Sequence, residues 1–435
     1  MSRTRGIARL DPTRLVPLLG LLPFKFNPLT RRARRDPHAH YRALRESSPV
    51  YRSPLFRGWV LTRHEDIAAV LRNPRFSSDR RNSPMLAAQS ERMAAELPEL
   101  QRFTDGVMLS KDAPDHTRLR RLVNKAFTPT IVKRLEPRIE EVVDRCLDRA
   151  LERESLEVIS ELAFPLPVTV IAEMLGVDAA NASAFRRWAT DLFSLTDPMA
   201  MFRAERREAA NRSVAEMRAF FSRVTEARRR APRDDLVSAL VAAEDEGKRL
   251  SEDELLSMCG SLVLAGHETT TNLIGTAAYC LLRFPEQRRR LVENPDLLPS
   301  AIEEVLRFEG VSHLIMRIAT EDAEIGSGVN RAVARKEQMV LLALAAANRD
   351  PEQFADPDRF DVARSPNRHL GFGLGMHFCL GANLARAEAQ LAVRCLLERL
   401  PEFSTLRTEA EWKPNPMLRG LRRLQLEWRC GGTRG

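Results

Sequence analysis

The stretch FGLGMHFCLG, from Phe372 to Gly381, decides the fold of this sequence. Two of its glycines let the backbone adopt positive φ and come close to a flat ligand. Cys379 stands at the end of the loop, just before a helix-like run over 382–400, where backbone N–H groups and a positive helix end favour thiolate over thiol. A thiolate held in this way is an axial ligand of haem iron. The alternative is a buried structural cysteine in a glycine-rich turn, which ten residues in this order disfavour.

A long helix is predicted to begin at Ser251 and to end at Phe284, before Pro285. Ser251 and Glu254 form an S-x-x-E capping box, and the length corresponds to about 50 Å. Both halves are apolar, so most of the helix must be buried, yet the centre, residues 267–272, is polar. This centre excludes a membrane span. Polar groups in the middle of a buried helix are costly, and they indicate a site of chemistry.

The remaining pattern is mainly helical. Short β-prone runs at 50–53 and 59–62 predict a hairpin, and a second β-prone patch lies between 315 and 344. After about residue 115, apolar residues recur mostly at helical spacing. We therefore predict one mainly α domain with a minor sheet, residues 1–435, in which 1–30 form an N-terminal extension.

The sequence resembles the cytochrome P450 superfamily over essentially its whole length. The pattern FGxGxHxCxG is similar to the haem-binding loop of that family, and Ala265-Gly266-His267-Glu268-Thr269-Thr270 is similar to its oxygen-activation segment. The resemblance implies the cytochrome P450 fold, with the long central helix over a haem b group. It also implies that Cys379 is the iron ligand, with Phe372, Gly373 and Gly381 beside the cofactor.

The central segment has a predicted role in proton delivery. Ala265 and Thr269 are i,i+4 neighbours on one helix face, and the small residues Ala265 and Gly266 leave room for O₂. The Thr269 hydroxyl and the Glu268 carboxylate are placed to relay protons. A helical threonine also bonds back to its i−4 carbonyl, and both roles are compatible.

Other residues fall at positions where the family holds haem propionates. His116 and Arg120 form an H-x-x-x-R pair on one helix face, and cations within reach of two carboxylates give the physical reason. Arg317 and His369 occupy two further positions, for which a surface role competes. His377 stands where many relatives have arginine and would face the same carboxylates.

Glu304-Val305-Leu306-Arg307 resembles the ExxR motif of the family. At i,i+3 the Glu304 and Arg307 side chains meet on one helix face, and arginine grips a carboxylate bidentately. The resemblance adds Arg364 from the turn-rich stretch 348–366 as a third partner. The motif alone is weak, and the expected role is structural.

The substrate pocket is expected between 83–108, the long helix and 311–316. The residues there are mostly apolar, and a solvated loop position is the alternative for His313. They suggest a fatty acid, terpenoid, steroid or polyketide-like substrate. The predicted lining consists of Met85, Leu86, Met108, Leu262, Ala265, Ser312, His313, Leu314 and Ile315.

The chain has 68 Lys and Arg against 59 Asp and Glu, a formal charge of +9 that is spread along the sequence. Nucleic-acid proteins usually concentrate such charge, and no recognition motif accompanies it here. Arg118, Arg121 and Lys125, beside the expected haem edge, form a possible docking surface for an acidic electron donor. An ordinary solvated helix face is equally compatible with them.

We expect a monooxygenase that inserts one atom of O₂ into an apolar substrate by hydroxylation or epoxidation. Its electrons would come from a separate ferredoxin or flavodoxin with a reductase. An H₂O₂-driven peroxygenase and a non-enzymatic haem sensor or carrier are the alternatives, and the Glu268-Thr269 pair disfavours both. The six cysteines show no paired spacing, which favours a reducing compartment. We therefore expect a cytoplasmic monomer without a membrane span, in which the apolar segment 15–24 packs on the protein or dips into a surface.

Overall fold

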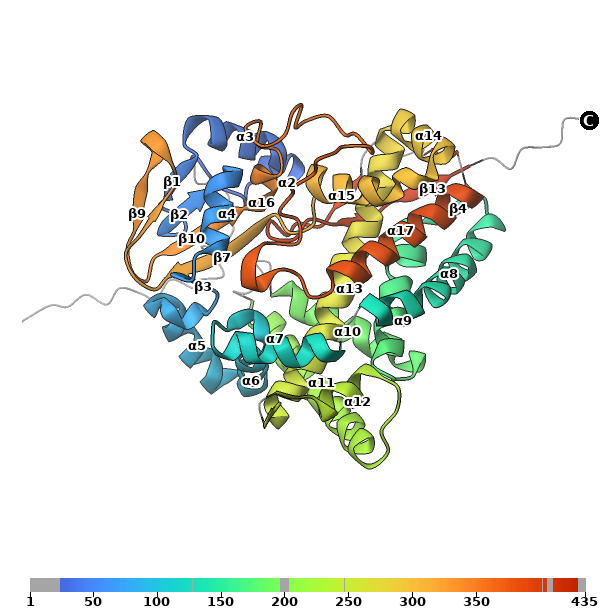
Figure 1. Ribbon diagram of the computed structural model, residues 1–435, viewed down its shortest axis with the longest axis horizontal. Coiled ribbons are helices and arrows are strands. Elements are labelled where there is room, and N and C mark those ends of the chain that lie inside the picture. Colours follow the sequence, from blue (N-terminus) through green and yellow to red (C-terminus); the bar gives the residue numbers. More distant parts are fainter. Residues whose placement is uncertain are drawn as a thin grey trace, which may run out of the picture.

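The computed structural model describes residues 24–126, 129–195, 203–245, 247–400, 402–404 and 410–428. Helices dominate this part, and a small sheet lies at one side with the N-terminal helices (Figure 1). The predicted fold class, mainly α with minor β, is confirmed. The apolar segment 15–24 lies almost wholly outside the described residues. Phe26 and Leu29, which follow it, are buried, and Phe26 packs in a cluster with residues of the main sheet.

Most of the helices that precede the long central helix lie around its lower half and one flank, whereas the first three lie with the main sheet (Figure 1). Proline at the first position begins several of them, because its fixed φ suits the helix and its missing N–H needs no partner there. These helices are α2 (Arg31–Arg35), α3 (Pro37–Ser47), α4 (His64–Arg72), α5 (Pro84–Glu96), α6 (Pro98–Gly106), α7 (Asp115–Ala126), α8 (Pro129–Leu151), α9 (Pro165–Met174), α10 (Ala182–Ser194), α11 (Ala204–Arg230) and α12 (Leu236–Ala242).

The central helix α13 (Glu252–Arg283) runs through the middle of the molecule (Figure 1). The predicted capping box is present: the Glu254 N–H donates to Ser251 Oγ at 3.3 Å, and the Ser251 N–H donates to Glu254 Oε2 at 2.9 Å. The chain continues through α14 (Pro285–Glu293), α15 (Leu298–Phe308), α16 (Leu344–Ala347) and α17 (Ala382–Arg399). Both α15 and α17 pack against α13.

The main sheet has the order β1-β2-β10-β7-β3. The predicted hairpin is confirmed, with Val50 opposite Leu61, and β2 joins β10 in the one parallel pairing of this sheet. Its strands are β1 (Val50–Ser53), β2 (Gly58–Leu61), β3 (Phe76–Ser77), β7 (Leu314–Ala319) and β10 (Met339–Ala343). The remaining strands form two-stranded pairs: β4 (Ser155–Glu157) with β13 (Gln425–Glu427), β5 (Glu244–Asp245) with β6 (Lys248–Arg249), β8 (Ala323–Ile325) with β9 (Ala332–Ala334), and β11 (Glu411–Trp412) with β12 (Leu421–Arg423).

Apolar burial fixes the position of α13. The largest cluster of buried side chains surrounds this helix, and two smaller clusters lie on the two faces of the main sheet. Burial of this kind contributes about 25 cal/mol per Å² of apolar surface. Among the helices of the described residues, none combines the length and apolar composition needed to cross a membrane.

Candidate active site

The loop before α17 has the backbone that its glycines predict. Gly373 and Gly375 adopt φ values of +73° and +75°. A Cβ on Gly375 would lie 2.5 Å from the backbone oxygen of Leu71 in α4, so only glycine fits there. The Cys379 N–H donates to the Phe372 oxygen at 3.0 Å and closes the loop. The sequence thus folds into a tight backbone that presents one cysteine immediately before a helix.

The surroundings of Cys379 act on its pKa in opposite directions. Burial raises the pKa of the thiol, and the Gly381 N–H and the Arg120 and Arg386 guanidinium groups only oppose that shift in part. Without a bound metal ion, desolvation of the charged form outweighs the helix end. A bound metal ion deprotonates a coordinating thiol outright.

The middle of α13 has an exposed position, although most of this helix is buried. Ala265 is exposed, and the Thr269 hydroxyl donates to the Ala265 oxygen at 2.6 Å. Gly266 lies on the other side, where an added Cβ would meet Ile171 of α9 at 3.5 Å. The expected back-bond of Thr269 is present, and Ala265 and Thr269 share the open face.

Two histidines from different elements meet beside the cysteine loop. The rings of His116 in α7 and His377 have centroids 4.2 Å apart. His116 is 2% exposed, and neither of its ring nitrogens has a hydrogen-bond partner; His377 Nε2 is also buried without one. Burial, followed by the charges of His116, Arg317 and Arg120, lowers the pKa of His377 to about 3.

The two arginines predicted to hold propionates lie in the same neighbourhood. Arg120 donates to the Phe378 oxygen at 2.8 Å, and Arg317 donates to the Met316 oxygen at 2.9 Å. Burial lowers the pKa of both guanidinium groups. Buried donors without acceptors are costly, and an anionic ligand removes that cost. The unpartnered histidines, the two arginines and the glycine loop therefore fit a haem with its carboxylates on the α7 side.

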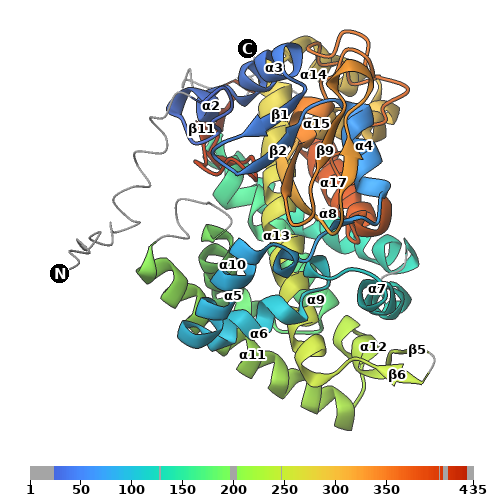
Figure 2. The ribbon, with the colours of Figure 1, turned by 90° about the vertical axis from the view of Figure 1, so that its left-hand side faces the viewer.

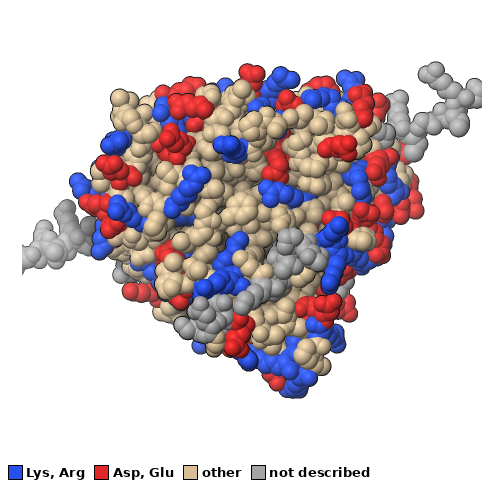
Figure 3. Space-filling view, in the orientation of Figure 1, with Lys and Arg blue, Asp and Glu red and all other residues tan. Residues whose placement is uncertain are grey.

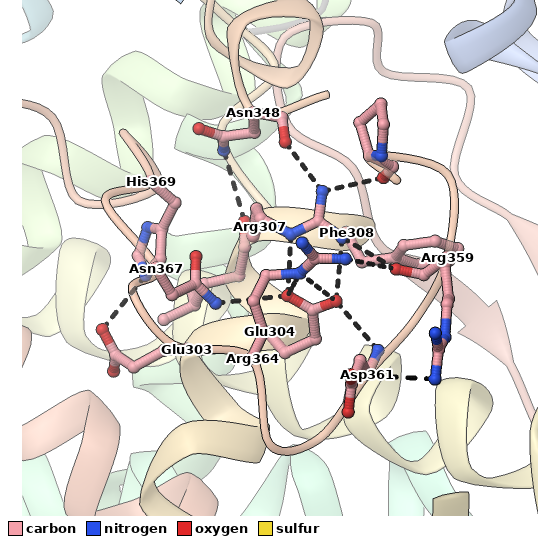
Figure 4. A network of polar contacts seen from close by, with 12 residues as sticks. Glu303, Glu304, Arg307, Phe308, Asn348, Arg359, Asp361, Arg364, Asn367 and His369 are labelled. Carbon is pink, nitrogen blue, oxygen red and sulfur yellow. Dashed lines mark hydrogen bonds and ion pairs between the residues drawn. The ribbon is translucent and has the colours of Figure 1, made fainter. Parts of the chain in front are cut away.

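His369 has different partners from those expected. Its Nε2 lies 3.0 Å from Glu303 Oε2, and its Nδ1 accepts from the Gly371 N–H at 3.0 Å (Figure 4). Arg386 of α17 grips the same Glu303 carboxylate at 2.7 and 2.8 Å. Burial would raise the pKa of Glu303, but the bonds from Arg386 and His369 outweigh it and lower the pKa to about 2. Because this carboxylate occupies His369, the structure does not group it with His116 and His377.

Glu304, Arg307 and Arg364 meet as one network (Figure 4). Arg307 donates to both Glu304 oxygens at 2.7 and 2.8 Å, and Arg364 donates to Glu304 at 3.1 Å. Arg307 and Glu304 are fully buried. Arg307 also donates to backbone oxygens of the stretch that leads to the cysteine loop: Asn348 at 2.9 Å, Pro357 at 2.8 Å and Arg359 at 3.1 Å. The network thereby fixes that stretch on α15.

Some members of this network carry no sequence signal. The Asn348 side chain accepts from the Leu370 N–H at 2.7 Å, and Asn367 donates to Glu304 at 3.2 Å. Glu303 stands next to the ExxR motif but is not part of it. Arg386 has no motif around it. Their roles depend on contacts between residues far apart in the chain.

The predicted pocket residues divide into two groups. Met85 is 52% exposed, and Leu86 and Met108 are half-buried. Leu262, by contrast, is buried on α13. Ile315 is half-buried and packs with the cluster on one face of the sheet, and Ala265 is exposed as described above.

The predictions for residues 312–314 need correction. His313 is 2% exposed rather than solvated, its Nε2 lies 2.8 Å from the Glu309 oxygen, and its ring packs on Tyr41 of α3. Leu314 is buried on the sheet face opposite to Ile315, because neighbouring strand residues point to opposite sides. Ser312 forms a β-bridge with Leu418. The structure therefore groups His313 and Leu314 with the N-terminal helices.

Glu268 has a partner that the sequence did not indicate. Lys413 Nζ lies 2.5 Å from Glu268 Oε1 and 2.9 Å from Asn272 Oδ1. The two charged residues are 145 positions apart, so no local pattern could have shown the pair.

Comparison with known proteins agrees with this architecture. The cytochrome P450 family model matches residues 17–423. The chain is 41% identical to cytochrome P450 monooxygenase PikC of Streptomyces venezuelae over 409 residues, which are 92% of this chain and 93% of PikC.

Two solved structures are also similar. P450BioI in complex with an acyl carrier protein ligated to hexadec-9Z-enoic acid matches with a TM-score of 0.84 and 36% identity, over 92% of this chain and 99% of that one. The myxobacterial CYP267B1 in complex with myristic acid matches with a TM-score of 0.83 and 41% identity, over 93% and 99%. The chain belongs to the cytochrome P450 family. It is a haem-thiolate monooxygenase of bacterial type, and its cofactor is haem b.

Proposed function

We propose that this monooxygenase oxidises a long apolar molecule by hydroxylation or epoxidation, with electrons from a separate ferredoxin or flavodoxin. The observation that carries the proposal is the open face of α13, where Ala265 is exposed beside Thr269 and Glu268. When bound, thiolate-ligated haem supplies the O₂-activating chemistry. The small Ala265 leaves space for reactants, and Thr269 and Glu268 hold protons there.

The residues predicted to hold the cofactor have separate roles in this proposal. Cys379 binds the iron, and the loop glycines that adopt positive φ bring the backbone close to the flat ring. His116 and His377 bind the propionates through ring nitrogens that have no hydrogen-bond partner, and Arg120 and Arg317 bind them through buried guanidinium groups.

The apolar side chains favour a fatty-acyl substrate within the classes considered. Met85, Leu86, Met108, Leu262 and Ile315 offer methyl and methylene groups and no charge. Relatives solved with myristic acid or with a fatty acyl group on a carrier protein support the same class. Burial of methylene groups contributes about 0.8 kcal/mol each, which suits a long chain.

The face that carries α4, α7 and α17 is the proposed docking surface for the electron donor. On it, Lys and Arg side chains border an uncharged central area (Figure 3). Arg118 is ion-paired with Glu254, whereas Arg121 is exposed. The side chain of Lys125 lies outside the described residues. A basic rim attracts an acidic ferredoxin or flavodoxin.

Two further expectations belong to this proposal. The five cysteines of the described residues are all free, which supports a reducing, cytoplasmic location. The protein is expected to act as a monomer.

The test is the absorption spectrum of the reduced, CO-bound protein, followed by titration with myristic acid. We expect the red-shifted Soret band of a thiolate ligand and a spin-state shift with the fatty acid. Turnover with a ferredoxin and its reductase should exceed turnover with H₂O₂. Faster turnover with peroxide would identify a peroxygenase instead, and absence of the thiolate band would refute the haem assignment.

A further inference from the structure

Lys413, in the turn after β11, reaches Glu268 from the C-terminal part of the chain. Its ammonium contacts the Glu268 carboxylate at 2.5 Å and the Asn272 side-chain oxygen at 2.9 Å. The Lys413 and Glu268 side chains keep 26% and 18% exposure. The ion pair therefore stands at a border between protein and solvent, where attraction is stronger than between fully exposed charges.

The turn that carries Lys413 is firmly attached to α13. The Trp412 ring lies edge-on to Tyr279 of α13 at 5.1 Å, and the Arg419 guanidinium stacks on Trp412 at 3.5 Å. The Lys413 N–H donates to the Gly420 oxygen at 2.8 Å. A Cβ on Gly420 would lie 2.1 Å from the Asn272 side-chain oxygen, so glycine is required for this close approach. The position of the ammonium is thus set by packing.

An open pocket lies on the other side of Lys413. It is a small hollow between the α2–α3 region and the turn after β11, two parts that lie next to each other in Figure 2, and it has room for about one water molecule. His40, Tyr41 and Asn415 line it together with Lys413. Its lining residues include no carboxylate.

The other end of the proposed relay is not connected to Glu268. The Thr269 hydroxyl donates to the Ala265 oxygen. Among the described residues, no hydrogen bond joins Glu268 to Thr269, because the Glu268 carboxylate is turned to Lys413. Proton delivery to Thr269 therefore requires the carboxylate to change partners.

We propose that Lys413 is a positioning residue that holds Glu268 where it is loaded with a proton from the pocket. A hydronium ion of the adjoining solvent gives its proton to the carboxylate oxygen and becomes water, while the Lys413 ammonium keeps its protons and its charge. The resulting carboxylic acid has lost the charge that attracts it to Lys413. It turns to Thr269, releases the proton there and returns as a carboxylate. This inference rests on the proposed function of Glu268 and Thr269.

The experiment compares haem-loaded wild type with Lys413→Met, using a ferredoxin, its reductase and myristic acid as the probe. We expect reductant consumption to fall about tenfold, less than the roughly 100-fold or greater contribution of general acid catalysis itself. The solvent deuterium isotope effect should increase, and more of the oxygen should leave as H₂O₂. Lys413→Arg should restore most of the activity, since it keeps a cation. Lys336→Met, at another exposed lysine, is the matched control.

A crystal structure of Lys413→Met provides a readout that is independent of turnover. We expect the Glu268 carboxylate to leave its present position and turn toward Thr269 or solvent. Lys413→Gln serves as a second variant if the methionine variant folds poorly.

The spectrum of the CO complex separates the possible failures. A normal thiolate band with an unchanged isotope effect and peroxide yield in the Lys413 variants would overturn the role of Lys413 alone. Absence of the band from the wild type would overturn the proposed function and this inference with it.

Discussion

The hydroxyl of Thr269 is held by its own helix, 2.6 Å from the Ala265 oxygen. This bond contributes little to the stability of the fold, because a threonine that bonds back to its i−4 carbonyl does not stabilise a helix. The hydroxyl is therefore available for the reaction. At the residue scale, the open face of α13 and this hydroxyl form the part of the site that performs proton chemistry.

Thr269→Ala should divert reducing equivalents from product to peroxide. The variant removes the proton donor but leaves the helix intact, because alanine has a higher helix propensity than threonine. H₂O₂ and oxidised myristic acid per electron consumed are the quantities to measure. Thr269→Ser, which keeps a hydroxyl, should behave like the wild type. An unaltered product yield per electron in the alanine variant would exclude Thr269 from the relay.

His267 predicts a pH dependence of stability. Its ring is buried against Phe164, neither nitrogen has a partner, and burial lowers its pKa from 6.5 to about 4. Between those values the unfolded chain binds a proton that the folded protein does not. Stability from this group is thus complete above about pH 6.5 and is lost as the pH falls toward about 4.

Comparison with His267→Phe tests this dependence. The difference in unfolding free energy between wild type and variant should change by on the order of 3 kcal/mol across that window. Urea unfolding at several pH values measures it, and the other histidines cancel in the difference. Parallel pH curves for the two proteins would show that His267 does not titrate as its burial predicts.

At the scale of elements, α15 holds the stretch that ends in the cysteine loop. Arg307 joins Glu304 to three backbone oxygens contributed by a segment some 40 to 50 residues further along the chain. Planar guanidinium geometry makes these contacts possible, and lysine cannot reproduce them.

Arg307→Lys should destabilise the protein by about 3–5 kcal/mol, because it leaves a buried carboxylate poorly paired. Chemical denaturation measures this loss, and haem retention should fall as well, since the cysteine loop depends on the network. Arg230→Ala, which removes an exposed i,i+4 partner of Glu226, should have no measurable effect. Equal stability of the two variants would contradict a structural role for the network.

At the scale of the whole molecule, the structure shows where part of the formal charge of +9 lies. Several arginines are used internally, in the α15 network and around the proposed propionate site. Others border the face that carries α7 and α17 (Figure 3).

Arg121→Glu should slow reduction by an acidic ferredoxin while leaving the myristic acid spin-state shift unchanged. Long-range attraction between opposite charges raises association rates, and salt screens it. Stopped-flow reduction at low and high ionic strength measures the effect, which should be largest at low salt. Arg230→Glu, on α11, is the control for net charge. Wild-type reduction kinetics of Arg121→Glu at low salt would remove Arg121 from the docking surface.

Local sequence determined the elements with short-range causes. The capping box of Ser251 and Glu254 began α13 where expected, and the β-prone runs at 50–53 and 59–62 formed the hairpin. The loop glycines required positive φ at their own positions. These features depend on residues within a few positions of each other, so the chain alone specifies them.

Only the tertiary structure decided which distant groups meet. Glu303 is hydrogen-bonded to His369, Lys413 forms an ion pair with Glu268, and the Tyr41 ring packs on His313. It also determines the surroundings of Cys379, where burial by the rest of the chain raises the pKa of the thiol and opposes the effect of the helix end. Desolvation and long-range pairing depend on everything packed around a group, whereas motifs report only its neighbours along the chain. The sequence therefore determined the family and the cysteine loop, and the fold decided the partners and charges within the site.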